Sequence, residues 1–179
     1  MASELQRRKI SGVFAAMDAD GDGLLEESDF QALTDRWTAI RGAEQGSEAH
    51  ARLTSVMMGW WATLLAVSDP ARDGDKVTLE DVLAVVDRLG SMTEVVTGTA
   101  HTMFDAVDEN SDDEISPAEY RQMIEGWTGT ATDTDEIFAL LDSNGDGRLS
   151  RAEFAVLWTE FWAGDSPDAP GNLIFGHYD

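Results

Sequence analysis

Short acidic stretches recur along the chain and place side-chain oxygens at alternate positions of a tight turn. In the clearest, residues 142–153 (the fourth loop), oxygens fall at positions 1, 3, 5 and 12 and glycine at position 6. A hard cation such as Ca²⁺ takes about six to eight oxygens, and position 7 adds its backbone carbonyl. Glycine permits the sharp turn. The predicted metal ligands are Asp142, Asn144, Asp146, Arg148 (through its carbonyl) and Glu153.

The first loop, residues 18–29, repeats this pattern but has aspartate where the fourth loop has its final glutamate. Aspartate is one methylene shorter, so bidentate contact is harder and coordination should fall toward the octahedral six that Mg²⁺ requires. We therefore expect this loop to bind metal with weaker discrimination against Mg²⁺. The predicted ligands are Asp18, Asp20, Asp22, Leu24 (through its carbonyl) and Asp29.

The third loop, residues 108–119, has every ligand position but carries Asp113 at position 6. Aspartate tolerates positive φ better than most residues, so this turn should be strained yet possible. Ser116 and Pro117 are typical of a helix start directly after it. The predicted ligands are Asp108, Asn110, Asp112, Glu114 (through its carbonyl) and Glu119.

The second loop, residues 69–81, fits the pattern in two ways. An ungapped count from Asp69 puts Glu80 at position 12 but Lys76 at the aliphatic position 8. A count back from Val77 makes Asp81 position 12 and requires an insertion or deletion. The interpretation as a partner loop without high-affinity metal is slightly favoured. Its candidate ligands are Asp69, Asp73, Asp75, Glu80 and Asp81.

Apolar residues at helical spacing flank every loop, which predicts eight helices in four helix–loop–helix units. Breaks are expected at residues 42–46, 90–91 and 129–132, where glycine occurs. The fold class is therefore all-α, with one pair of units in residues 1–90, a second in 91–163, and a tail from 164 to 179. Short β-bridges should join paired loops, with Leu25 opposite Val77 and Ile115 opposite Leu149.

The composition favours cations as partners. The formal net charge is −23, with 12 basic against 35 acidic residues, which argues against nucleic acid and anionic membranes. The absence of cysteine excludes disulfides and thiolate metal sites. The apolar stretch at 56–67 is too short to span a bilayer, and the N-terminal residues do not resemble a secretory signal. We expect a cytoplasmic, monomeric protein.

These loops resemble those of EF-hand proteins, and the whole chain resembles the sarcoplasmic calcium-binding protein group, including its calerythrin-like and calexcitin-like relatives. The resemblance rests on four helix–loop–helix units with a poor second loop, the wide gap between Asp18 and Asp69, and a C-terminal tail rich in Asp, Pro and apolar residues. It implies a compact pair of domains and a calcium-buffering role, although some relatives are proposed to signal.

The tail ends in an apolar cluster, residues 173–175, that would be an aggregation hazard if it were left in water. We expect it to fold back over the groove between the helices. A calcium sensor opens such a groove to capture a target helix, whereas a buffer barely opens. A tail that fills the groove favours the buffer, and the competing function is a calcium-triggered regulator that binds a protein target.

A third hypothesis is a carrier of a small aromatic, luciferin-type ligand, because the chain has six tryptophans and related photoproteins enclose such ligands. His50, His101, His177 and Tyr178 could contribute to such a site. Aromatic core packing is the favoured interpretation of the tryptophans. No nucleophile elbow, phosphate loop or histidine pair indicates catalysis, so no catalytic residue and no enzymatic activity are predicted.

Overall fold

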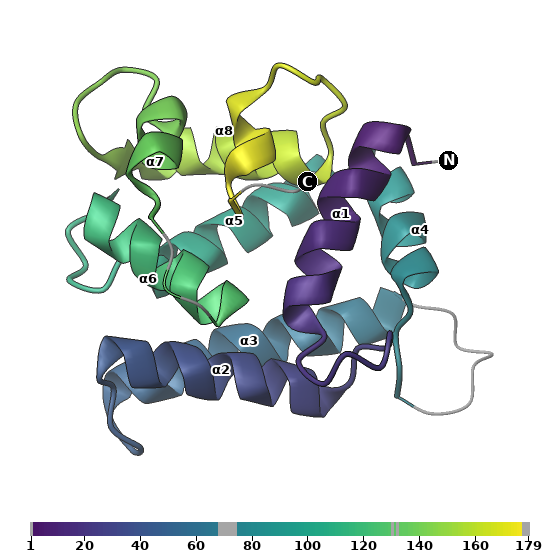
Figure 1. Ribbon diagram of the computed structural model, residues 1–179, viewed down its shortest axis with the longest axis horizontal. Helices are drawn as coiled ribbons and strands as arrows, with labels where there is room; N and C mark the ends of the chain where they lie inside the picture. The colour runs from purple at the N-terminus through teal and green to yellow at the C-terminus, as the bar shows by residue number, and fades with distance from the viewer. Residues whose placement is uncertain (1, 68–74, 130, 132, 177–179) are drawn as a thin grey trace.

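The computed structural model describes residues 2–67, 75–129, 131 and 133–176, and these contain eight α-helices and one small sheet (Figure 1). The expected all-α fold of four helix–loop–helix units is confirmed. The helices are α1 (Glu4–Met17), α2 (Glu27–Arg41), α3 (Glu48–Val67), α4 (Leu79–Leu89), α5 (Thr93–Val107), α6 (Pro117–Thr128), α7 (Asp135–Leu141) and α8 (Arg151–Trp162). The strands are β1 (Glu114–Ile115) and β2 (Leu149–Ser150), and a 3₁₀-helix, η1, covers Pro170–Leu173.

Every helix that follows a loop begins with a capping box, in which two residues cap each other's backbone N–H groups. The N-cap residue occupies position 9 of the loop and its partner occupies position 12. One carboxylate at position 12 therefore both starts the helix and faces the loop. The pairs are Glu26–Asp29, Thr78–Asp81, Ser116–Glu119 and Ser150–Glu153.

The loops pair as the sequence predicts. Strands β1 and β2 are antiparallel, with Ile115 opposite Leu149. Leu25 and Val77 form an isolated antiparallel bridge, with N···O distances of 2.8 and 2.9 Å. All four side chains are fully buried. Each aliphatic residue at position 8 thus joins two loops and fills the core beneath them.

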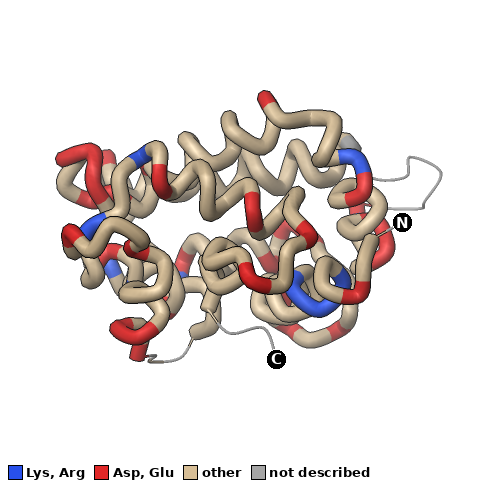
Figure 2. Tube along the Cα trace, turned by 90° about the horizontal axis from the view of Figure 1, so that it is seen from above, with Lys and Arg blue, Asp and Glu red and all other residues tan. Residues whose placement is uncertain are grey.

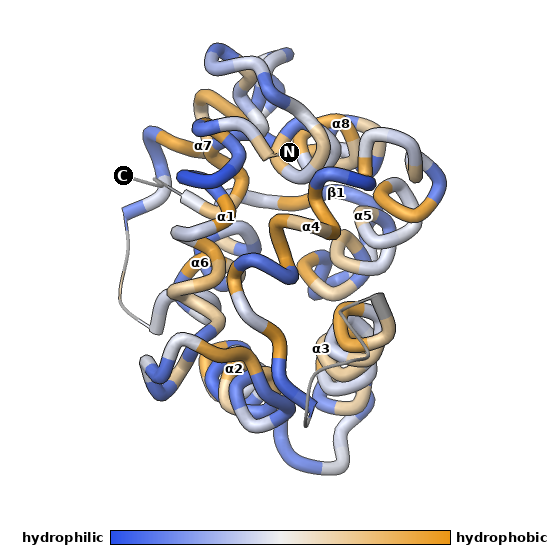
Figure 3. The backbone as a smooth tube through the Cα atoms, turned by 90° about the vertical axis from the view of Figure 1, so that its right-hand side faces the viewer, coloured by the Kyte–Doolittle hydropathy of each residue, from blue (hydrophilic) through white to orange (hydrophobic). Residues whose placement is uncertain are grey.

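The two halves of the molecule pack directly on each other, because α2 contacts both α3 and α6. Hydrophobic segments alternate with hydrophilic ones along the helices (Figure 3), and the apolar sides form one continuous core. Gly126 of α6 lies so close to α2 that a Cβ atom there would meet Trp37 at 3.1 Å. Arg36 strengthens this contact by donating to the carbonyls of Gly126 and Trp127 at 2.9 and 2.6 Å.

The last described residues return to the core. Ile174 is fully buried, and the ring of Phe175 lies 4.8 Å from that of Phe161 and 4.9 Å from that of Trp127. The Tyr120 hydroxyl donates to the carbonyls of Leu173 and Ile174 at 3.1 and 3.0 Å. The tail is therefore held both by aromatic contacts and by hydrogen bonds to its backbone.

A buried lysine fixes the start of this tail. Lys9 Nζ donates to Asn172 Oδ1 at 2.9 Å and to the carbonyls of Glu160 and Gly164 at 3.1 and 3.2 Å. Burial lowers the pKa of Lys9 to about 8, although the charge of Asp165 opposes the shift. Helix α1 is thus tied to the segment that follows α8.

The apolar stretch noted at residues 56–67 lies within α3. None of the described helices is both long and apolar enough to cross a membrane.

Candidate metal centres

The carboxylate at position 1 organises each of the three complete loops. Asp142 Oδ1 accepts from the N–H of Gly145 at 3.1 Å, and its Oδ2 accepts from that of Gly147 at 2.7 Å. Asp18 accepts equivalent bonds from Gly21 and Gly23 in the first loop. In the third loop, Asp108 accepts from the N–H groups of Asp112 and Asp113 at 3.2 and 3.0 Å. These bonds wrap the backbone around one carboxylate, so the turn and the first ligand are built together.

Positions 3 and 5 repeat the arrangement on a smaller scale. Asp20 Oδ1 accepts from the N–H of Asp22 at 3.1 Å, and Asp22 Oδ1 accepts from that of Leu24 at 2.8 Å. The same bonds occur in the other two loops, at Asn110, Asp112 and Glu114 and at Asn144, Asp146 and Arg148. The residue at position 7 is thereby held beside the ligand at position 5.

The oxygens converge on a space of the right size for a cation. Asp18, Asp20 and Asp22 offer oxygens that all lie within 4.8 Å of one another, and Asp108, Asp112 and Glu119 do the same. Ca²⁺–oxygen bonds are about 2.3–2.6 Å long, so ligands on opposite sides of one ion lie about 5 Å apart. These separations match oxygens that surround a single Ca²⁺.

Position 12 closes each loop, and the fourth loop leaves an oxygen free there. Asp29 Oδ1 accepts from the N–H of Ala19 at 3.0 Å, and Glu119 Oε2 accepts from that of Glu109 at 2.7 Å. Glu153 uses Oε1 to cap Ser150, whereas its buried Oε2 has no hydrogen-bond partner within the described part of the chain. A buried carboxylate oxygen without a partner is costly, and a metal ligand is the role that removes the cost.

Like charges crowd the third loop. Burial raises the pKa of Asp108 in spite of hydrogen bonds from Asp113 and Asp112, and the charge of Glu119 adds to the rise. The hydrogen bond from the N–H of Glu114 lowers the pKa of Asp112. A divalent cation would relieve this repulsion, so the electrostatics fit the same occupant as the geometry.

Family comparisons agree with this geometry. Residues 99–159 match the EF-hand domain pair family, and residues 10–34 match the EF-hand family. The chain is an EF-hand protein.

Several curated relatives of the chain carry the name of one group of these proteins. Sarcoplasmic calcium-binding protein 1 from Astacus leptodactylus is 26% identical over 88% of this chain and 87% of its own. Calerythrin from Saccharopolyspora erythraea is 23% identical over 92% of this chain and 96% of its own. The solved structure of coelenterazine-binding protein from Renilla muelleri, in its calcium-loaded apo form, has a TM-score of 0.74 at 18% identity and covers 98% of this chain and 100% of its own. This EF-hand protein fits the sarcoplasmic calcium-binding protein group.

The third EF-hand makes its turn without glycine. Positions 4 and 6 have positive φ in all three complete loops, and in this one they are Ser111 at 59° and Asp113 at 62°. The sequence pointed to strain at Asp113 but not at Ser111. The equivalent residues of the first and fourth loops are all glycines: Gly21, Gly23, Gly145 and Gly147. A comparison with these glycines would have revealed the strain at Ser111.

Arginines of the fourth EF-hand contact the acidic residues of the third. Arg148 forms an ion pair with Glu114 across the β-bridge. Arg151 pairs with Asp113 at 3.1 Å and with Asp105 at 2.6 Å, while its guanidinium lies 4.5 Å from the centre of a phenylalanine ring. Arg151 therefore holds the strained aspartate from outside its loop. Sequence reasoning missed it, because the two positions are 38 residues apart.

Another arginine supports the third EF-hand from the other half of the molecule. Arg41, at the end of α2, donates to the carbonyls of Ala106 and Val107 at 2.7 and 3.1 Å. These carbonyls end α5 directly before Asp108. The Arg41 side chain is only 4% exposed, and burial lowers its pKa. It satisfies helix-end carbonyls that would otherwise be buried without donors.

The described part of the second loop follows the frame counted back from Val77. The bridge to Leu25 places Val77 at position 8. Asp81 is buried and accepts from the N–H of Thr78 at 2.8 Å, as the position-12 residues of the other EF-hands do at their caps. Glu80 is exposed and pairs instead with Arg7 at 2.8 Å.

In that frame the sequence offers few ligands. Ungapped counting from Val77 gives Pro70, Arg72 and Gly74 at positions 1, 3 and 5, and none of these has a side-chain carboxylate. Asp75 is exposed, while Asp69 and Asp73 lie outside the described residues. Lys76 forms an ion pair with Glu26 of the first EF-hand at 2.9 Å. A positive charge thus takes part in the contact between these two loops.

Proposed function

We propose that this EF-hand protein binds Ca²⁺ at its first, third and fourth loops and serves as a calcium buffer. The observations that carry the proposal are the convergence of carboxylate oxygens in the first and third loops and the unpartnered Oε2 of Glu153 in the fourth. Two relatives are named as a sarcoplasmic calcium-binding protein and calerythrin, which supports the same function. Acidic residues also outnumber basic ones along the trace (Figure 2), as a cation-binding protein requires.

In each site, side-chain oxygens at positions 1, 3, 5 and 12 and the carbonyl at position 7 surround the ion. Capture of the ion by the native state stabilises the fold, because the unfolded chain has no preformed site. The fourth loop uses Asp142, Asn144, Asp146, Arg148 and Glu153; the third uses Asp108, Asn110, Asp112, Glu114 and Glu119; the first uses Asp18, Asp20, Asp22, Leu24 and Asp29.

The first loop discriminates least between Ca²⁺ and Mg²⁺. Both oxygens of Asp29 accept backbone N–H bonds, at 3.0 Å from Ala19 and 2.8 Å from Glu26, as both oxygens of Glu119 do. The difference lies in the side chain of Asp29, which is one methylene shorter. This favours one oxygen on the metal and six-coordination. Replacing Asp29 with glutamate should raise the Ca²⁺/Mg²⁺ selectivity of this loop. If a competition titration shows the same Ca²⁺/Mg²⁺ selectivity in this variant, Asp29 does not weaken the discrimination against Mg²⁺.

The second loop acts as a structural partner without high-affinity metal. Its Val77 completes the bridge to Leu25, and its Asp81 caps α4. Calorimetric titration of the full chain with Ca²⁺ in the presence of Mg²⁺ should therefore give three ions per chain. The Asp81→Asn variant should give the same number. A fourth tight ion that is lost in Asp81→Asn would overturn the structural role.

A buffer is favoured over a sensor because the tail already covers apolar surface. Phe175 is 7% exposed and packs among aromatic rings of α6 and α8, where a sensor would bind its target. We expect the fluorescence of an anionic hydrophobic dye to change little when Ca²⁺ is added to the full chain. A large calcium-induced rise, or a calcium-dependent protein complex recovered from lysate, would support the regulator instead.

A further inference from the structure

A lysine of the second loop lies against the first metal loop. The bridge puts Val77 at position 8, so Lys76 is position 7, and its Nζ forms an ion pair with Glu26 Oε1 at 2.9 Å. The hydrogen bond and the charge of Glu26 raise the pKa of Lys76. The charges of Asp22 and Asp20 add to this rise in pKa. Two carboxylates of the first loop therefore act on this lysine in addition to its ion-pair partner.

The backbone brings the lysine to this position. Glu26 and Lys76 are each next to a residue of the bridge, in which Leu25 and Val77 exchange N–H···O bonds of 2.8 and 2.9 Å. The Lys76 side chain is 47% exposed, so salt screens its charge without moving the loop that carries it.

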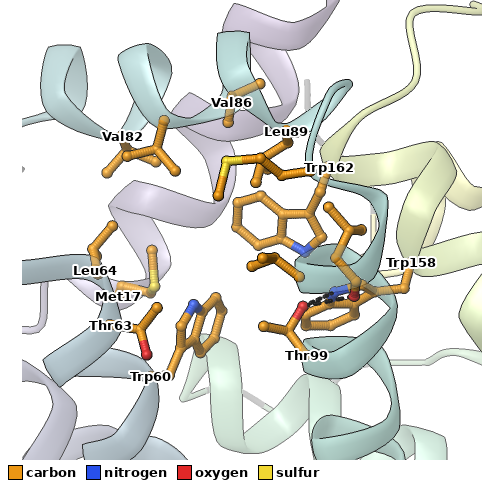
Figure 4. A pocket seen from close by; sticks show the side chains of 14 residues that line it. Met17, Trp60, Thr63, Leu64, Val82, Val86, Leu89, Thr99, Trp158 and Trp162 are labelled. Carbon is orange, nitrogen blue, oxygen red and sulfur yellow. Dashed lines mark hydrogen bonds between the residues drawn. The ribbon is translucent and has the colours of Figure 1, made fainter. Parts of the chain in front are cut away.

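The core beneath the two loops also fixes their relative position. Met17, directly before Asp18, and Val82, in the first turn of α4, line one apolar pocket (Figure 4). Leu64 of α3 lines it as well, and all three apolar side chains are buried. The residues considered for a luciferin-type ligand are not among its described lining: His50 and His101 do not line it, and His177 and Tyr178 lie outside the described residues. Packing of the flanking helices thus holds the second loop beside the first.

The first loop has the greatest need of a counter-charge among the three complete loops. Its predicted ligands include four carboxylates, on Asp18, Asp20, Asp22 and Asp29. The third and fourth loops each have three, because position 3 is Asn110 or Asn144. A divalent ion neutralises two charges, which leaves one more negative charge at the first site than at the others. Lys76 supplies the positive charge that offsets it.

The second half of the molecule repeats this arrangement. Arg148 is position 7 of the fourth loop and forms an ion pair with Glu114 of the third. The hydrogen bond and the charge of Glu114 raise the pKa of Arg148, and the charge of Asp112 adds to the rise. In each half, a basic residue at position 7 of one loop therefore acts on a predicted ligand at position 5 of its partner.

We propose that Lys76 is a counter-charge that lowers the affinity of the first loop for divalent cations and stabilises this loop when no ion is bound. The ammonium group repels the ion and attracts the carboxylates of the empty loop. This role rests on the proposed binding of metal by the first loop. Ca²⁺ and Mg²⁺ carry the same charge, so Lys76 shifts both affinities by the same factor, whereas Asp29 acts through its reach and changes their ratio.

Removal of the charge in Lys76→Gln tests the effect on affinity. Competition titrations against a chelator, followed by the amide NMR signals of Gly21 and Gly23, report on the first loop of the full chain. At about 0.01 M salt the variant should bind Ca²⁺ and Mg²⁺ each about threefold to tenfold more tightly. At about 1 M salt, where the Debye length is about 3 Å, the difference should nearly vanish. Unchanged affinity at low salt, or a gain that persists at high salt, overturns the proposal.

The stability of the metal-free protein separates a counter-charge from an ordinary structural contact. In chelator at low salt, Lys76→Gln should unfold at a lower temperature than the unmodified chain, because repulsion among the loop carboxylates is no longer offset. The same substitution should tighten metal binding. A lost structural contact would destabilise the protein without tightening binding, and that result overturns the proposal.

Two further variants serve as controls. Lys76→Arg keeps the charge and should retain the original affinity. Arg7→Gln changes the net charge by the same amount, but Arg7 pairs at 2.8 Å with Glu80, outside the first loop, so it should leave this affinity unchanged. A gain in affinity in either control that equals the gain in Lys76→Gln overturns the assignment to Lys76. If Gly21 and Gly23 of the unmodified chain do not respond to Ca²⁺, the proposed function fails at this loop and the inference fails with it; a normal response with unchanged affinity in Lys76→Gln overturns the inference alone.

Discussion

The third and fourth EF-hand loops lie side by side in one two-stranded sheet, yet different residues make their turns. Positions 4 and 6 are Gly145 and Gly147 in the fourth loop but Ser111 and Asp113 in the third, and all four have positive φ. Both loops wrap their backbone N–H groups around the carboxylate at position 1. The acceptor pattern and the strand pairing therefore set the turn, and glycine lowers its cost without being required.

The two loops also differ in charge and in outside support. The third contains six acidic residues and the fourth three. Arg41 contacts the helix that enters the third loop, and Arg151 contacts Asp113 within it. The more strained and more strongly charged loop is thus the one held by arginines from other elements.

Calcium removal should expose this difference most strongly. A site at 1,000 times its Kd contributes about 4 kcal/mol of stability, so chelation should lower the free energy of unfolding by several kcal/mol. Because repulsion among carboxylates is greater in the third loop, its amides should lose protection from hydrogen exchange before those of the fourth. If the amides of both loops lose protection together, the difference in charge does not make the third loop less stable than the fourth.

The position-12 residues allow a matched pair of substitutions. Glu119→Gln and Glu153→Gln should each weaken Ca²⁺ at their own loop by more than the roughly 10–100-fold typical of outer-shell changes. Without metal, the free energies of unfolding of the two variants should differ. Both oxygens of Glu119 accept backbone N–H bonds, so an amide N–H₂ there would oppose the N–H of Glu109 or of Ser116 and destabilise the apo fold by about 1–3 kcal/mol. Glu153 Oε2 has no such partner in the described chain.

Urea unfolding of both variants in chelator measures this divergence. Equal stabilities for the two apo variants would mean that the second backbone bond to Glu119 contributes nothing to the fold.

The sequence predicted what depends on local spacing. It identified the acidic loops whose oxygens the structure brings together, paired Ile115 with Leu149, and pointed to the unusual residue Asp113. It could not choose between Glu80 and Asp81, because that choice depends on how Val77 pairs with another loop. It also missed Arg41, whose partners lie 65 and 66 residues away and become neighbours only when the two halves pack. Long-range contacts of this kind leave no periodic signal in the chain.

Arg41 and Arg36 separate packing from support of the third loop. Both join α2 to the second half, but Arg41 donates to the carbonyls that precede Asp108, whereas Arg36 donates to those at the end of α6. Each change to methionine should cost about 1–3 kcal/mol, because buried carbonyls lose their donors. Only Arg41→Met should also lower Ca²⁺ affinity at the third loop, as measured by calorimetry. Equal affinities in the two variants would reduce Arg41 to a packing role.

The smallest expected effects on stability come from position 4, where each loop can be given the residue of the other. Ser111→Gly should stabilise the protein by up to about 1 kcal/mol, because it relieves a left-handed conformation that disfavours a Cβ atom. Gly145→Ser should destabilise it by a similar amount, since a Cβ there meets no atom within 4 Å and only backbone strain remains. Thermal unfolding in excess Ca²⁺ measures both. If Ser111→Gly is instead destabilising, the greater entropy of glycine in the unfolded chain outweighs the strain, and the third loop is no more strained than the fourth.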